Sequence, residues 1–139
     1  MTQNEKDLLL KDLCARLPYG VKFACNKNIY TAKGFDLIVT DEGGWGYAVT
    51  AKGIAPIEID FIKPYLFPLS SMTEKQKKEY EDALTYHDYT KGGWTIAKSF
   101  EDEYIIPYWF VDFCNKNHFD YRGFIPMGLA IDATGLNIY

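Results

Sequence analysis

Apolar and polar residues alternate along residues 21–62, and this period-two pattern constrains the fold more than any other feature. In the stretch "VKFAC", Val21, Phe23 and Cys25 share one face, as they do in a half-buried strand. The residues Asn26 to Asn28 indicate a turn. Together with the later turns, the pattern predicts strands at 21–25, 29–39 (bent at Gly34), 47–51 and 57–62.

Helices are predicted on both sides of this β-rich region. Leu9, Leu10, Leu13 and Leu17 predict a helix over residues 4–17 that ends at Pro18, with the charged residues, Arg16 among them, on its polar face. Prolines in "KPYLFP" are expected to end the sheet. A second helix is predicted over residues 73–85, where Ser71 and Glu74 fit a capping box. A third is predicted in "PYWFVDFCNKN", with Trp109, Phe110 and Phe113 as its apolar stripe.

These elements predict an α+β protein of one domain. We expect a small, strongly bent antiparallel sheet or SH3-like barrel of about four to five strands, with the N-terminal helix and two later helices packed on it. The single domain would span residues 1–139: an N-terminal helix (1–17), a β-rich half (18–68) and a helical half with a C-terminal clasp (69–139). A chain of this length can bury a sizeable core without a metal or disulfide.

The charge of the chain argues against nucleic-acid binding. The net charge is −4, the pI is near 5.1, and Arg16 and Arg122 are the only two arginines. Nucleic-acid binding is therefore not favoured, because phosphate contacts rely on clustered Lys and Arg.

The three cysteines (Cys14, Cys25 and Cys114) are far apart, which is typical of reduced thiols in the cytoplasm. No signal peptide or membrane span is predicted, so we expect a cytoplasmic protein that does not bind membranes.

The stretch "HFDYRGFIPMGLA" raises the question of catalysis. His118 and Asp120 could act as a base and its orienting carboxylate, with His87 or a cysteine such as Cys114. The favoured interpretation is a helix exit that clasps the fold. In that interpretation His118 meets the helix dipole and Asp120 and Arg122 pair or cap locally. The apolar neighbours dock on the core: Phe119, Phe124, Ile125, Met127 and Leu129. Phe124→Ala would then cost roughly 3 kcal/mol or more, and His118→Ala little.

Metal and phosphate sites are weakly indicated. Cys114 and His118 are four residues apart, but the remaining His and Cys residues have no recognisable ligand spacing. The loop "DEGGWG" opens no helix and matches no phosphate-binding motif, so we expect a hairpin tip and no cofactor.

Aromatic residues are the favoured binding residues. Chains rich in Tyr and Trp often use part of that content at an interface. The candidates are Trp45, Tyr86, Tyr89, Trp94, Tyr104 and Tyr108.

Two long stretches carry a family resemblance: "LLLKDLCARLPYGVK" (residues 8–22), and "IKPYLFPLSSMTEKQKKEY" together with "NKNHFDYRGFIPMGLAIDATGLNIY". In these stretches the chain resembles a family of small uncharacterised proteins encoded by prophages and mobile elements of gut anaerobic bacteria. The family has no established activity, so the resemblance implies no catalytic residues. It implies a cytoplasmic accessory role.

The sequence therefore favours a non-enzymatic protein-binding or accessory module with an unidentified protein partner. One alternative is a small hydrolase that uses His118 and Asp120 with His87 or a cysteine. Another is nucleic-acid binding through the SH3-like surface, with phosphate contacts from Lys22, Lys27, Lys33, Lys52 and Lys63. The sequence does not indicate an oligomeric state.

Overall fold

A computed structural model describes residues 1–79 and 108–139, with side chains from residue 110 onward in the second range. In chain order the helices and strands are α1 (Gln3–Arg16), β1 (Lys22–Cys25), β2 (Asn28–Val39), β3 (Trp45–Ala51), β4 (Ile57–Glu58), β5 (Lys63–Leu66), α4 (Tyr108–Lys116) and β6 (Ile131–Asp132). Short 3₁₀ turns lie at Leu17–Tyr19, Ile59–Phe61 and Leu69–Ser71. The fold is α+β, as predicted.

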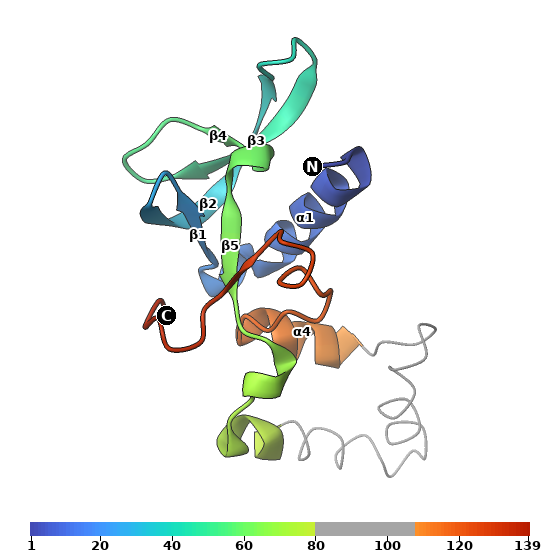
Figure 1. Cartoon of the computed structure of the whole chain (residues 1–139), viewed down its shortest axis with the longest axis vertical. Coiled ribbons are helices and arrows are strands. Elements are labelled where there is room, and N and C mark those ends of the chain that lie inside the picture. The colour runs from blue at the N-terminus through green and yellow to red at the C-terminus, as the bar shows by residue number, and fades with distance from the viewer. Residues whose placement is uncertain (80–107) are drawn as a thin grey trace.

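One mixed sheet of six strands organises the chain, in the order β4-β3-β2-β1-β5-β6 (Figure 1). The expectation of a purely antiparallel sheet or closed SH3-like barrel is wrong. The edge strand β6 runs parallel to β5, and β4 and β6 lie at opposite edges, so the sheet stays open. The C-terminal segment supplies this additional strand, which periodicity could not indicate because β6 has only two residues.

The helix α1 begins at a capping box. The Thr2 hydroxyl accepts a hydrogen bond from the Glu5 backbone N–H, and the Glu5 carboxylate accepts one from the Thr2 N–H. Such reciprocal bonds satisfy donors that the first helical turn leaves free. After Arg16 the chain tightens into a 3₁₀ turn, and Gly20, with φ of 68°, reverses it into the sheet.

The predicted first hairpin is confirmed. Cys25 pairs with Asn28, so the turn consists of Asn26 and Lys27, both with positive φ, as two-residue hairpin loops require. Val21, Phe23 and Cys25 are buried on one face, as the alternation predicts. The predicted bend in the second strand is also confirmed, because the β2–β3 register shifts between Ala32 and Gly34.

Two predictions about the following strands are wrong. The predicted strand at 57–62 is only two residues long and turns into 3₁₀ geometry at Ile59. The sheet then continues through Pro64, which lies opposite Phe23 of β1 in strand β5. A proline is tolerated here because β6 pairs only with Tyr65 and Leu66, so one side of Pro64 needs no N–H donor.

The next helix is capped differently from the prediction. Residues 74–79 are helical, but the capping box joins Thr73 and Gln76 rather than Ser71 and Glu74. The Ser71 hydroxyl donates to the Pro68 carbonyl instead, and Glu74 pairs with Lys77. The rest of this predicted helix lies outside the described residues.

The main core lies between α1 and the sheet. Leu9 and Leu13 of the helix pack against Val21, Phe23 and Leu66, and Phe124 from the C-terminal segment joins them. A second, smaller cluster holds α4 against the same segment through Phe110, Cys114 and Phe119. In the described ranges, no helix is both long and apolar enough to cross a bilayer.

Candidate functional site

The polar segment that begins at His118 ends helix α4 in a Schellman motif. The Phe119 N–H donates to the Cys114 carbonyl, and the His118 N–H donates to the Asn115 carbonyl. His118 itself has a φ of 60°, a left-handed conformation that is usually taken by glycine at this position. A histidine persists there because its ring is fixed: it stacks on Tyr139, with ring centroids 3.7 Å apart and an interplanar angle of 11°.

This environment overturns the predicted role of His118 as a cation at the helix end. Burial, followed by the charges of Arg16 and Lys22, lowers the pKa of His118 to about 4. The imidazole is therefore neutral at neutral pH and gains nothing from the helix dipole. Its Nδ1 is buried without a hydrogen-bond partner in the described part of the chain.

Asp120 caps a local turn, as predicted. Its carboxylate oxygens accept hydrogen bonds from the backbone N–H groups of Phe124 and Ile125, each 2.8 Å long. The turn that these bonds hold places Phe124 and Leu129 in the core. Met127 remains exposed, so the prediction that Met127 packs on the core is wrong. Both oxygens serve the turn, which leaves the carboxylate in a structural role rather than orienting His118.

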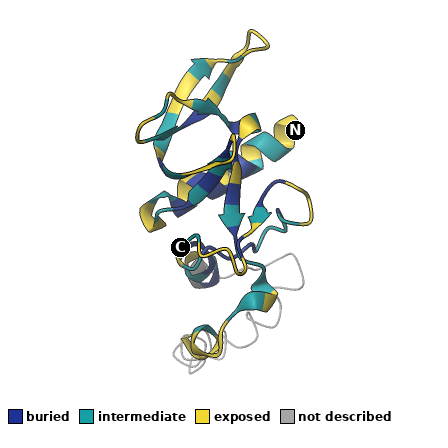
Figure 2. Cartoon of the chain, turned by 60° about the vertical axis from the view of Figure 1, so that its left-hand side comes forward, coloured by how far each residue is buried: buried dark blue, intermediate teal, exposed yellow. Residues whose placement is uncertain are grey.

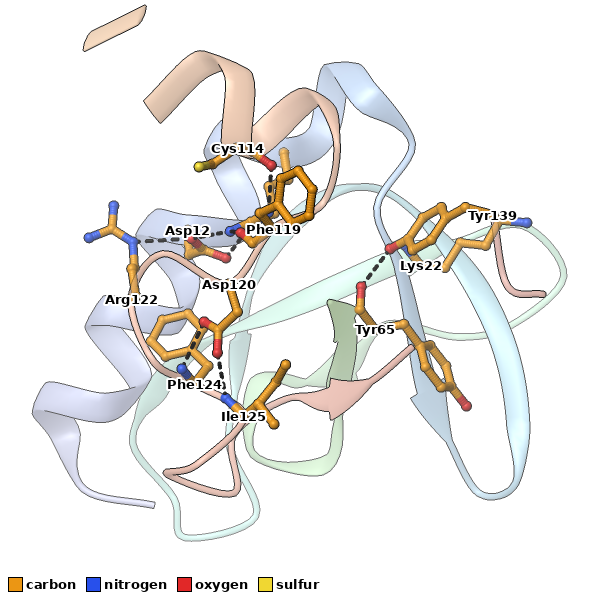
Figure 3. A network of polar contacts seen from close by, with 11 residues as sticks. Asp12, Lys22, Tyr65, Cys114, Phe119, Asp120, Arg122, Phe124, Ile125 and Tyr139 are labelled. Carbon is orange, nitrogen blue, oxygen red and sulfur yellow. Dashed lines mark hydrogen bonds and ion pairs between the residues drawn. The ribbon is translucent and has the colours of Figure 1, made fainter. Parts of the chain in front are cut away.

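Arg122 does not pair with Asp120 as expected. Its Nε donates to Asp12 of α1 over 3.1 Å (Figure 3). Arg16 lies against the same carboxylate, with its Nε 2.7 Å from Oδ2. Arg16 also donates to the backbone carbonyls of Cys114 and Phe119. The Tyr121 ring lies against both guanidinium groups, 5.4 Å from Arg16 and 4.9 Å from Arg122. We call Asp12, Arg16, Tyr121 and Arg122 the arginine junction.

The arginine junction was not predicted from the sequence, where the charged residues of the helix, Arg16 among them, were expected to lie mostly away from its leucines. Arg16 and Asp12 are both fully buried. Two signals were present. Residues 9, 12, 13 and 16 follow the spacing of one buried helix face, so the charged pair shares that face with Leu9 and Leu13. The chain also has only two arginines among its 15 basic residues, and arginine is the cation best suited to buried pairs; the structure brings both to one carboxylate.

The catalytic and metal-binding candidates do not form a reactive site in the described residues. Burial raises the pKa of the Cys114 thiol to about 12, so it remains protonated and is a poor nucleophile. No group of three His, Cys, Asp or Glu side chains suited to hold a metal ion occurs in residues 1–79 and 108–139. His87, the proposed partner of His118, lies outside the described residues.

A different part of the molecule leaves large apolar side chains exposed. The outer part of the β2–β3 hairpin, residues 36–47, rises above the rest of the sheet and is here called the hairpin arm (Figures 1 and 2). Two of its cross-strand pairs are Leu37–Tyr47 and Val39–Trp45. Directly paired residues point to the same face, so the four side chains form one ladder. Leu37, Val39, Trp45 and Tyr47 are 58%, 61%, 73% and 49% exposed.

The loop of the hairpin arm is closed by backbone bonds and glycine. The Thr40 N–H donates to the Gly44 carbonyl over 2.7 Å, and the Gly43 N–H donates to Thr40 over 2.9 Å. A Cβ at Gly46 would lie 2.6 Å from the Thr40 Cγ2, so any larger residue there would force the Thr40 side chain to move. Glu58 steadies the loop from β4 by accepting a hydrogen bond from the Asp41 N–H. The loop is thus a hairpin tip, as predicted, and it presents Trp45 to solvent.

Trp45 is the one predicted binding residue whose side chain is described, and it is exposed. Tyr86, Tyr89, Trp94 and Tyr104 lie outside the described residues. The backbone of Tyr108 begins α4, but its side chain is also outside them. Leu37, Val39 and Tyr47 were not predicted as binding residues, because the alternation of a strand does not reveal which face stays uncovered.

Comparisons with protein-family models, curated proteins and solved structures found no match to this chain.

Proposed function

We propose that this chain is a non-enzymatic binding module that contacts a protein partner through its hairpin arm. The ladder of Leu37, Val39, Trp45 and Tyr47 is the observation that carries the proposal. Contiguous apolar surface of this kind is typical of interaction sites, whereas single exposed apolar residues are ordinary. Trp and Tyr are also among the residues whose loss most weakens protein complexes.

The position of the ladder supports the same role. Strand β1 pairs with residues 28–31 of β2, and β4 pairs with Ala48 and Val49 of β3. The described strands therefore flank the base of the hairpin and leave the arm as a two-stranded projection. A two-stranded hairpin gains little stability in water, so exposed aromatic residues on it are explained better by binding than by stabilisation of the fold. A cytoplasmic accessory role for a mobile genetic element is part of this proposal.

Site-specific photo-cross-linking in cells of the source organism tests the proposal. A benzophenone amino acid is placed at Trp45, at Tyr47 or, as a control, at Tyr19, which is exposed beyond the far end of α1. We expect the same cross-linked protein from positions 45 and 47 and not from position 19. A product from position 19 alone, or none from positions 45 and 47, would contradict the proposal.

A further inference from the structure

A groove separates the hairpin arm from the first half of α1. Its volume is about 400 Å³, and its apolar lining includes Leu10 of the helix and Leu37, Trp45 and Tyr47 of the arm. One face of the exposed ladder therefore forms a wall of a recess rather than a flat patch. A recess of this size accommodates a few side chains of a partner segment.

Carboxylates dominate the charges of this groove. Asp7, Glu42, Glu58 and Asp60 line it, and Lys6 is the one basic residue among its described lining. The Lys6 ammonium lies 2.8 Å from Asp60 and is therefore already paired. The hydrogen bond that Lys6 donates to Asp60, together with the charges of Asp60, Glu42 and Glu58, raises the pKa of Lys6. The groove thus keeps an excess of negative charge beside its aromatic wall.

From this combination we infer that the groove binds a cationic segment of a partner protein, in which Lys or Arg residues flank an apolar side chain. The inference rests on the proposed function and adds the chemistry of the partner. The apolar side chain would contact Leu10 and Leu37. The cations would face the carboxylates and the rings of Trp45 and Tyr47, which attract cations over their faces.

Charge also argues against two other occupants. A second copy of the chain has a net charge of −4, so it would bring like charge to an already acidic groove. Nucleic acid would bring phosphates to the same carboxylates. A cationic peptide is the occupant that complements both the apolar wall and the charged rim.

Titration with defined peptides tests the inference. The probe is an acetylated and amidated peptide of alternating Lys and Leu residues, seven residues long. It is compared with peptides in which Glu replaces Lys or Ser replaces Leu. Binding to the full chain is measured by isothermal titration calorimetry at low and moderate salt. We expect the Lys–Leu peptide to bind more tightly than either comparison peptide, and its affinity to fall with salt.

Variants of the chain locate the binding. Trp45→Ser should weaken binding of the Lys–Leu peptide about tenfold, and Glu42→Gln about threefold. The matched controls are Phe61→Ser, an exposed aromatic residue that does not line the groove, and Glu74→Gln, an exposed carboxylate away from it. Both controls should stay within about twofold of the parent chain. Circular dichroism checks that each variant is folded.

The outcomes separate the inference from the proposed function. If Glu74→Gln weakens binding as much as Glu42→Gln, the attraction is a general effect of net charge and the inference is wrong. If the Glu–Leu or the Lys–Ser peptide binds best and depends on Trp45, the inference is also wrong, but the arm remains a binding surface. If no peptide depends on Trp45 and cross-linking from positions 45 and 47 fails, both are wrong.

Discussion

The arginine junction and the hairpin arm place their side chains in opposite environments. At the junction, charged residues are buried, and Arg16 donates to a carboxylate and to two backbone carbonyls. On the arm, apolar residues are exposed although a core lies nearby. Either arrangement is unfavourable unless something compensates for it. The junction is compensated within the chain, whereas for the arm we propose compensation by a partner outside it.

The largest expected effect comes from breaking the junction. Arg16→Met should lower the free energy of unfolding by about 3–5 kcal/mol, because it leaves the buried Asp12 with Arg122 as its one cationic partner and removes the charged donor from two backbone carbonyls. Urea denaturation followed by circular dichroism measures the change. Arg122→Met is the matched control and should cost much less, because its side chain is 22% exposed and makes one bond to Asp12. Equal losses for the two variants would show that Arg16 has no special role.

The next effect concerns the clasp. Phe124→Ala should cost about 3–4 kcal/mol, because this fully buried ring would leave a cavity between α1 and the sheet. Met127→Ala, from the same segment but exposed, should change the free energy of unfolding by less than about 0.5 kcal/mol. The pair of urea curves would refute the clasp if both variants unfolded at the parent midpoint.

A smaller effect should appear only at acidic pH. The folded state holds the pKa of His118 at about 4, below its ordinary value of 6.5. The unfolded chain therefore binds the proton more readily, so the stability from a neutral His118 is complete above pH 6.5 and is lost as the pH falls towards 4. The loss should reach about 3 kcal/mol at pH 4. His118→Asn, which tolerates the left-handed conformation, should remove this part of the pH dependence.

Unfolding of the parent chain and His118→Asn between pH 4 and 7 measures this difference. Parallel pH profiles would contradict the assigned environment of His118.

The burial and stacking of this ring also change the sequence-based expectation that His118→Ala is nearly harmless. The residue now has a structural role beside Tyr139, which itself donates to the Tyr65 carbonyl and accepts from the Lys22 N–H.

Local patterns predicted the elements that local interactions determine. The turn at Asn26 and Lys27, the bend at Gly34 and the Asp120 turn all depend on residues within a few positions, and each was predictable. The arginine junction was not, because Arg16 meets its carbonyl partners 98 and 103 residues later in the chain. Strand β6 depends in the same way on a distant partner, β5. The hairpin tip that carries Trp45 was predictable, but the sequence left open whether Trp45 packs back or stands out, and the ladder beside it depends on which face α1 covers.

The most direct test of the difference between the two regions is the stability of a variant that changes only the arm. The double variant Trp45→Ser, Tyr47→Ser should cost no more than about 1 kcal/mol relative to the parent chain, because Trp45 and Tyr47 are 73% and 49% exposed and lose mainly cross-strand contacts. Measured by the same urea titration, Arg16→Met should differ by several kcal/mol. An arm variant that is destabilised as much as Arg16→Met would contradict the account, since the exposed ladder would then belong to the fold and not to a partner.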